Sequence, residues 1–130
     1  MDRHDLLVKA HRLLREYDGS TVTAAAEIWA EEKLGMVKAD KGTAGFDGTL
    51  PDGRKLQVKS KKADAHSDAG TYVTLSKSTL ELADNLLIVF VDDETCEVTR
   101  HVGPVPIGEL SDRKGRYYVS DILDILKRQP

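Results

Sequence analysis

The chain has 130 residues, with 19 Lys and Arg against 22 Asp and Glu, and a formal net charge of −3 at pH 7. This length suits one domain, residues 1–130, large enough to bury an apolar core. The negative balance excludes a generic polycation, so any nucleic-acid surface has to be local. Cys96 is the only cysteine, which excludes an internal disulfide and a cysteine-rich zinc site and favours a cytoplasmic protein. No apolar run approaches the roughly 20 residues of a membrane helix, so we expect no membrane partner.

Two helices are predicted before the first strand. Over residues 3–17, leucines, an alanine and a tyrosine recur at helical spacing and form one apolar stripe. A second helix is predicted over 21–34, where Ser20 or Thr21 can cap the start and Gly35 ends it. Residues 36–44 are expected to form a connection.

Two glutamates of the second helix are candidates for a site. Glu27 and Glu31 are four residues apart and share a helix face. Ile28 sits beside that face, which places Glu27 near the core boundary. By spacing alone, two solvated glutamates on a surface helix are the simpler interpretation.

Residues 45–59 are predicted to form a β-hairpin. The Pro-Asp-Gly sequence at 51–53 is a strong turn signal, because proline presets φ, aspartate accepts local hydrogen bonds and glycine adopts the left-handed conformation. A three-residue loop closed by Leu50 and Arg54 then sets the register. In that register three further pairs follow: Thr49 with Lys55, Gly48 with Leu56, and Asp47 with Gln57.

Strict alternation in this hairpin divides the side chains between two faces. The apolar face is expected to join the core and contains Phe46, Leu50, Leu56 and Val58. The other face gathers an acid, an amide and lysines within cross-strand reach of one another: Asp47, Thr49, Lys55, Gln57 and Lys59.

The second half of the chain alternates short strands and helices. The apolar run 86–91 is predicted to be a strand buried on both faces, central in the sheet beside the hairpin. The sequence Gly-Pro-Val-Pro at 103–106 is expected to break regular structure. The other predicted elements are strands at 72–75, 97–102 and 115–119, helices from Ser76 or Ser78 to about 84 and from 121 to 128 with Ser120 as its cap, and a helical turn at 107–110.

Two local features can be interpreted either as structural or as functional. His66 and Asp68, in the polar loop 63–70, could bind a metal, although such loops usually only connect elements. The basic run from Arg54 to Lys62 contains no acid and could bind phosphates through Lys55, Lys61 and Lys62. It could equally be a solvated edge strand, since lysine also deters edge pairing.

The hairpin resembles the active site of the PD-(D/E)XK, or restriction-endonuclease-like, nucleases. Asp47 matches the aspartate of that motif, and Gln57-Val58-Lys59 stands for its acid-X-Lys sequence. Glu27, in preference to Glu31, matches the acid on the preceding helix. The resemblance covers residues 24–91 and implies an α/β (α+β) fold, a mixed central sheet flanked by helices. The chain departs from the motif where Phe46 replaces proline and Gln57 replaces the acid.

The resemblance implies a metal-dependent nuclease that hydrolyses phosphodiester bonds in nucleic acid. Asp47, Glu27, Gln57 and the Val58 carbonyl would hold Mg²⁺ or Mn²⁺, and Lys59 would orient water or stabilise charge on the phosphate. Two other functions stay open: a nucleic-acid-binding module that has lost catalysis, and a protein-interaction module on the same scaffold. Because the chain is too small to wrap a duplex alone, we expect a homodimer or a partner protein.

Overall fold

The computed structural model describes residues 2–17, 19–64 and 67–128. It is a mixed α/β fold with a five-stranded sheet in the order β1-β2-β3-β5-β6 and a separate two-stranded sheet, β4-β7. In chain order the elements are α1 (Arg3–Glu16), α2 (Thr21–Leu34), β1 (Val37–Lys38), β2 (Gly48–Thr49), β3 (Lys55–Lys62), β4 (Tyr72–Thr74), α3 (Lys77–Leu82), β5 (Asn85–Val91), β6 (Val98–Pro106), the 3₁₀ helix η1 (Ile107–Glu109), β7 (Arg116–Tyr118) and α4 (Val119–Arg128).

The large sheet mixes parallel and antiparallel pairs. Strand β3 runs parallel to β5, with Leu56 beside Asn85 at one end and Lys62 beside Val91 at the other. All other neighbouring pairs of this sheet are antiparallel. The crossover from β3 to β5 passes through β4 and α3, as a parallel connection requires. The mixed sheet predicted from the sequence is therefore confirmed.

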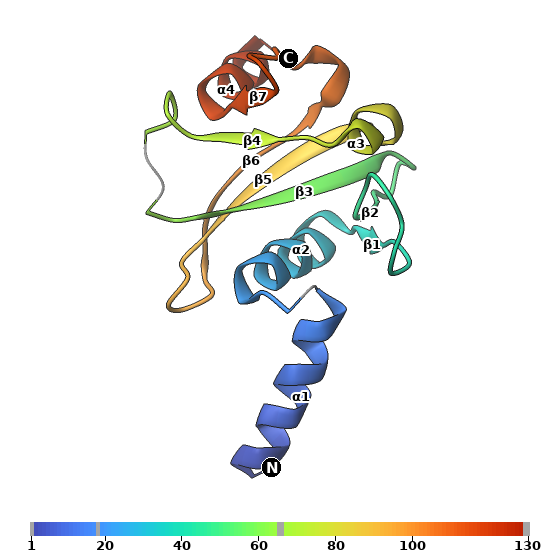
Figure 1. Ribbon diagram of the computed structural model, residues 1–130, viewed down its shortest axis with the longest axis vertical. Coiled ribbons are helices and arrows are strands. Elements are labelled where there is room, and N and C mark those ends of the chain that lie inside the picture. The colour runs from blue at the N-terminus through green and yellow to red at the C-terminus, as the bar shows by residue number, and fades with distance from the viewer. Residues whose placement is uncertain (1, 18, 65–66, 129–130) are drawn as a thin grey trace.

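Strand β5 is buried along its whole length, as its apolar run predicts. Its side chains point alternately to the two faces of the sheet and pack in two separate core clusters. On one face Leu87 and Val89 pack with the small residues of α2 and with Leu56 and Val58 of β3. On the other, Ile88 packs with residues of β4, β7 and α4. Figure 1 shows the resulting layers, with α2 on one side of the sheet and β4, β7 and α4 on the other.

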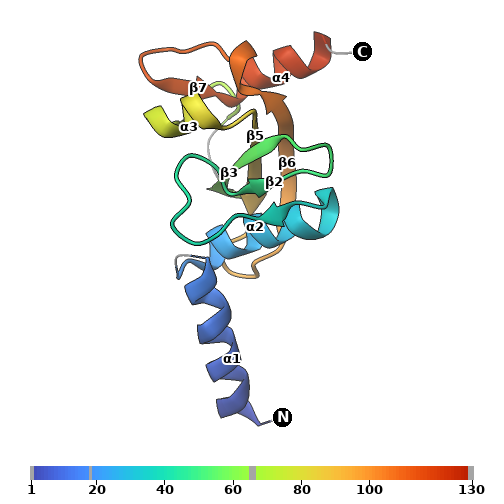
Figure 2. The same cartoon turned by 90° about the vertical axis from the view of Figure 1, so that its right-hand side faces the viewer.

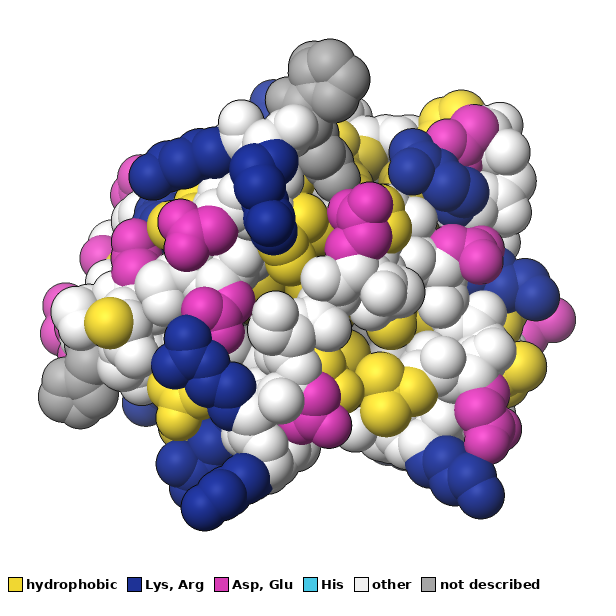
Figure 3. Space-filling view, turned by 90° about the horizontal axis from the view of Figure 1, so that it is seen from above, with side chains coloured by type: hydrophobic (Ala, Val, Ile, Leu, Met, Phe, Trp, Pro, Cys, Tyr) yellow, Lys and Arg dark blue, Asp and Glu magenta, His cyan; other side chains and the backbone are white. Residues whose placement is uncertain are grey.

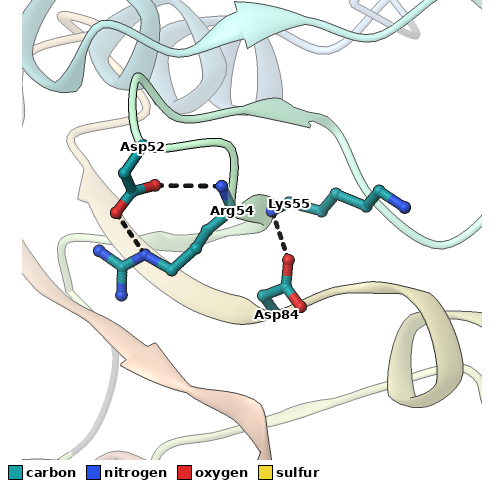
Figure 4. A network of polar contacts seen from close by, with 4 residues as sticks. All are labelled: Asp52, Arg54, Lys55 and Asp84. Atoms are coloured by element: carbon teal, nitrogen blue, oxygen red, sulfur yellow. Dashed lines mark hydrogen bonds and ion pairs between the residues drawn. The ribbon is translucent and has the colours of Figure 1, made fainter.

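The turn between β2 and β3 has the predicted register. Gly48 pairs with Leu56, and the Leu50 N–H donates to the Arg54 carbonyl at 2.8 Å. Gly53 has φ of 91°, a conformation that glycine adopts without a Cβ penalty. Figure 4 shows two hydrogen bonds within the turn: the Asp52 carboxylate accepts from the backbone N–H and the Nε of Arg54, at 3.0 and 2.6 Å.

Asp84, the residue before β5, is hydrogen-bonded to Lys55, the first residue of β3. Its carboxylate accepts from the Lys55 N–H at 2.8 Å, and its own N–H donates to the Lys55 carbonyl at 2.8 Å. This pair of bonds sets where the parallel ladder begins, one residue before Leu56 meets Asn85. The position of every β3 side chain beside β5 follows from that register.

Hydrogen bonds and an ion pair hold together the layer formed by β4, β7 and α4 and join it to β6. The Thr71 carbonyl accepts from the Val119 N–H at 2.9 Å, and the Asp68 carbonyl accepts from the Ser120 N–H at 3.0 Å. The Asp68 carboxylate also forms two hydrogen bonds with the Arg100 guanidinium, at 2.8 and 3.1 Å. The two backbone bonds therefore hold the segment before β4 to the start of α4, and the Asp68–Arg100 pair joins this layer to β6 of the large sheet.

One prediction about an element is wrong and another holds in part. Helix α4 begins at Val119, so Ser120 lies inside the helix and is not its cap. At 103–106 the ladder to β5 has a register shift, as the predicted irregularity requires, but β6 continues through it to Pro106. The helix predicted over 3–17 forms as α1, and its apolar stripe is not covered: no α1 residue is buried, and Leu7 is 67 % exposed. Figures 1 and 2 both show α1 projecting away from the body.

Candidate functional site

Glu27 and Asp47, the two candidate acids, line the same cavity. It has a volume of about 110 Å³ and lies where α2, β1 and the segment from 39 to 47 meet the end of α1. Glu27 is only 7 % exposed, although it sits on a helix whose other buried residues are alanines. Lys38 and Tyr17 also line the cavity. The structure thus brings together one carboxylate from a helix and one from the entry to the hairpin.

Asp47 forms hydrogen bonds with β3 that a residue of a paired strand would otherwise form. Its N–H donates to the Leu56 carbonyl at 2.8 Å, and its Oδ2 accepts from the Val58 N–H at 2.8 Å. Strand β2 begins only at Gly48, so its pairing with β3 reaches only as far as Leu56. The carboxylate therefore satisfies a backbone donor that a longer β2 would have paired.

The predicted division of the hairpin into two faces holds on β3 and fails before β2. Leu56 and Val58 are buried in the cluster beneath α2. Phe46, predicted to share their face, instead packs against the opposite cluster, and the Lys55 Nζ lies 5.3 Å from its ring centroid. The reason is that the chain bends at Asp47, so strict alternation does not extend past Gly48.

Gln57 and Lys59 lie on the other face of β3 from the cavity. Since Leu56 and Val58 point toward α2, the alternate residues Gln57 and Lys59 point away from it. Neither lines the cavity of Glu27 and Asp47. Both are partly exposed, and the Gln57 Nε2 lies 3.5 Å from the Val58 carbonyl oxygen.

Beyond Leu56, β3 has an open edge on the side of β2. In the part of the chain that the structure describes, no strand pairs with residues 57–62 on that side. The Asp47 carboxylate lies at this edge. A ligand that approached the edge would meet Asp47 there and the side chains of Gln57 and Lys59 on one of the two faces.

Lys38 and Tyr17 were not predicted as site residues. Residues 36–44 were expected to be a connection, and Lys38 instead ends strand β1 with its Nζ 5.3 Å from the Tyr17 ring centroid. The Tyr17 hydroxyl donates to Glu31 at 2.7 Å. Burial raises the pKa of this phenol well above its ordinary value, and the bond to Glu31 and the charges of Glu31, Glu16 and Glu27 raise it further. No local sequence signal marks either residue, because the contact joins the end of α1 to strand β1, 21 residues farther along the chain.

The predicted nucleic-acid-binding lysines lie in three different settings. Lys55 is exposed beside Phe46. Lys61 is half-buried, with its Nζ 5.5 Å from the Tyr72 ring centroid. Lys62 forms an exposed salt bridge with Asp93 at 3.6 Å.

The donor set at the cavity suits a hard cation. Carboxylate oxygens are the ligands that Mg²⁺ and Mn²⁺ prefer, and Mg²⁺ is often held by one or two carboxylates with waters and substrate oxygens. Glu27 and Asp47 supply that number. Among residues 2–17, 19–64 and 67–128, no group of three or more His, Cys, Asp or Glu side chains is arranged to hold a metal ion. The other metal candidate, His66, lies outside the described residues, and Asp68 pairs with Arg100.

The comparisons with known proteins add no family to this picture. No protein-family model matches the chain, and no curated protein matches it. Among the described residues, no helix has both the length and the apolar character to cross a membrane.

Proposed function

We propose that this chain is a metal-dependent nuclease of the PD-(D/E)XK class, which hydrolyses phosphodiester bonds in nucleic acid with Mg²⁺ or Mn²⁺. The observation that carries the proposal is the cavity shared by Glu27 and Asp47. The two acids come from the elements that the resemblance names, and they are 20 residues apart in the sequence. Glu31, the other candidate, is engaged by the Tyr17 hydroxyl, which supports the choice of Glu27.

The order of elements gives further support. A helix, a β-hairpin and a crossover to a parallel strand follow one another as α2, β2–β3 and β5. This is the order of the restriction-endonuclease-like core that the resemblance implies. In the described part of the chain, β3 beyond Leu56 has an open edge, which would let a polynucleotide reach Asp47, and Lys59 lies farther along the same strand.

In this proposal each residue has a separate task. Asp47 and Glu27 would hold the metal, and the Val58 carbonyl would complete its surroundings. Gln57 points from the other face of β3, so its amide would reach the metal only around the open edge of that strand. When bound, the metal would activate water and neutralise charge on the phosphate. Lys59 stabilises the negative charge that develops on the phosphate oxygens. Because Gln57 is neutral, the site depends more on its two carboxylates.

A second candidate function is a nucleic-acid-binding module without cleavage. It is favoured by the position of Gln57 and Lys59 on the face of β3 away from the cavity. Under either function we expect a homodimer or a partner protein, and the exposed leucines of α1 offer a surface for one.

A cleavage assay with calorimetry separates the two candidates. The parent should cut single- or double-stranded substrates with Mg²⁺ or Mn²⁺ and not with EDTA, and Lys59→Ala should keep the metal but lose rate. Gln57→Glu restores the usual acid and should tighten metal binding. If neither the parent nor Gln57→Glu binds Mg²⁺ or Mn²⁺, the nuclease proposal falls and the binding module takes its place.

A further inference from the structure

Two tyrosines lie side by side on the outer face of the β4–β7 sheet. Val73 and Tyr117 are buried in the core cluster beneath this sheet. Their neighbours in the antiparallel register, Tyr72 opposite Tyr118, therefore point outward. The two rings are 5.4 Å apart between centroids and inclined at 52°, and both residues are partly exposed.

Cationic side chains surround this pair of rings. The Arg116 guanidinium carbon lies 4.6 Å from the Tyr72 centroid, and the Lys61 Nζ lies 5.5 Å from the same centroid. The Arg113 guanidinium carbon lies 5.1 Å from the Tyr118 centroid. We call Tyr72, Tyr118, Lys61, Arg113 and Arg116 the tyrosine platform. Figure 3 looks onto the end of the molecule that carries α4 and β7, where Lys and Arg side chains stand among hydrophobic and acidic ones.

The charges of the platform are only partly compensated. Arg113 is paired with Asp121 at 2.6 Å, and Asp112 accepts from the Gly115 N–H at 2.6 Å. In the described part of the chain, neither Lys61 nor Arg116 forms a salt bridge with a carboxylate. The platform therefore keeps two cations for an anionic ligand beside two aromatic faces.

A hollow of about 550 Å³ borders the platform. Arg113, Lys114, Arg116 and Tyr118 line it, together with Asp112. A ligand seated there would meet aromatic and guanidinium planes on one side and phosphate-binding cations around it. Unstacked bases bind such planes, and phosphates bind such cations. Bases inside a duplex are stacked on each other and present only their edges.

We propose that the tyrosine platform binds single-stranded nucleic acid, with bases stacked on Tyr72 and Tyr118 and phosphates held by Lys61 and Arg116. This inference deepens the proposed function by naming the form of its substrate, and it rests on that function for its relation to cleavage. Lys61 lies two residues beyond Lys59 on the same face of β3. A strand bound to the platform can therefore continue along β3 toward Lys59.

The test measures binding without cleavage. Fluorescence anisotropy of the full chain in EDTA uses labelled oligo(dT), oligo(U) and a duplex, each about 15 nucleotides long, near the upper end of known single-strand site sizes. The parent should bind a single strand more tightly than the duplex, and the comparison of oligo(dT) with oligo(U) distinguishes DNA from RNA. Equal or tighter binding of the duplex would overturn the inference.

Matched variants assign the binding to the platform. Tyr72→Leu and Tyr118→Leu should each weaken single-strand binding by about tenfold to a hundredfold, as expected for the loss of one base–aromatic stack. Arg116→Ala should also weaken it and should lower the salt slope by about 0.7. Arg54→Ala removes the same charge at the far turn and should bind as the parent does. Parent-like binding by both tyrosine variants would overturn the inference.

Two controls keep the result unambiguous. Photocrosslinking of iodouracil-containing oligonucleotides to the parent needs no variant, and the crosslinks should map to Tyr72 and Tyr118. Crosslinks confined to other segments would overturn the inference even if a leucine variant failed to fold. A chain that binds single strands at the platform but cuts nothing with either metal refutes the nuclease proposal alone. A chain that cuts duplex DNA unaffected by both tyrosine variants refutes the platform alone.

Discussion

Replacement of Asp47 should separate its structural role from its proposed metal-binding role. A carboxylate that only faced an open cleft would add little to stability. In the structure, however, the Asp47 carboxylate accepts from the Val58 N–H at 2.8 Å in a partly buried setting. Asp47→Ala removes this acceptor and leaves the backbone donor without it. Asp47→Asn keeps an oxygen acceptor and removes the charge.

The expected losses differ because hydrogen bonds to charged groups are worth more than neutral ones. For Asp47→Ala we expect the free energy of unfolding to fall by about 2 kcal/mol, within the range for a lost charged partner. For Asp47→Asn we expect a loss of about 1 kcal/mol or less. For a domain of this size the alanine variant should therefore melt about 5–10 °C below the parent.

Urea denaturation followed by circular dichroism measures both free energies, and calorimetry with Mg²⁺ and Mn²⁺ measures metal binding. Both variants should lose metal binding and cleavage. Asp40→Ala is the matched control, since Asp40 lines the same cavity but is exposed. It should change the free energy of unfolding by less than about 0.5 kcal/mol. Equal stability of the alanine and asparagine variants would refute the structural role, and Mg²⁺ binding by Asp47→Asn would refute the role as ligand.

Three further predictions follow from single contacts. Changing Lys61 and Lys62 together to alanine should weaken nucleic-acid binding and lower its salt slope by about 1.5; an unchanged slope would show that they only solubilise the chain. Gly48→Ala should lower the urea midpoint, because its Cβ would lie 2.6 Å from a backbone oxygen and overpacking costs about 1–3 kcal/mol, whereas Gly108→Ala has open space and should not. The hydrogen-bonded guanidinium partner of Asp68 lowers the pKa of that carboxyl. The Asp68–Arg100 pair stabilises the fold by less than about 1 kcal/mol, because both side chains are exposed. This stabilisation is fully present above the ordinary carboxyl pKa of about 3.9, and it is lost as the pH falls through the lower pKa of the folded state. The stability difference between the parent and Asp68→Asn should therefore shrink between pH 7 and pH 2, and a constant difference would contradict this.

The sequence predicts the elements whose signals are local. The turn at 51–53 sets the pairing of Gly48 with Leu56, because its residue types allow only a few loop geometries. The apolar run 86–91 predicts β5, because no other soluble element buries six consecutive apolar side chains so readily. Glu27 is predicted at the core boundary from its neighbour Ile28, and it is buried.

The features that were missed depend on contacts between distant segments. Phe46 changes face because β2 begins only at Gly48, where the chain pairs with Lys38 of β1 and Leu56 of β3, and because the chain bends at Asp47 before it. The pairing of Tyr72 with Tyr118 joins strands 46 residues apart. Neither alternation nor turn chemistry contains that information. The sequence therefore predicts which residue types form the candidate site, but it does not predict on which face of the sheet each side chain lies.

The projection of α1 has a consequence for local unfolding and for amide hydrogen exchange. A 14-residue helix with no buried residue gains little from tertiary packing, and isolated helices of this length are marginal in water. Its amide hydrogens should therefore exchange with solvent through local fraying, at rates far above those of the fully buried strand β5. Helix α1 and the sheet thus form two units of different cooperativity. A ligand or second chain that covers the α1 leucines would slow exchange in the first unit while leaving the second unchanged.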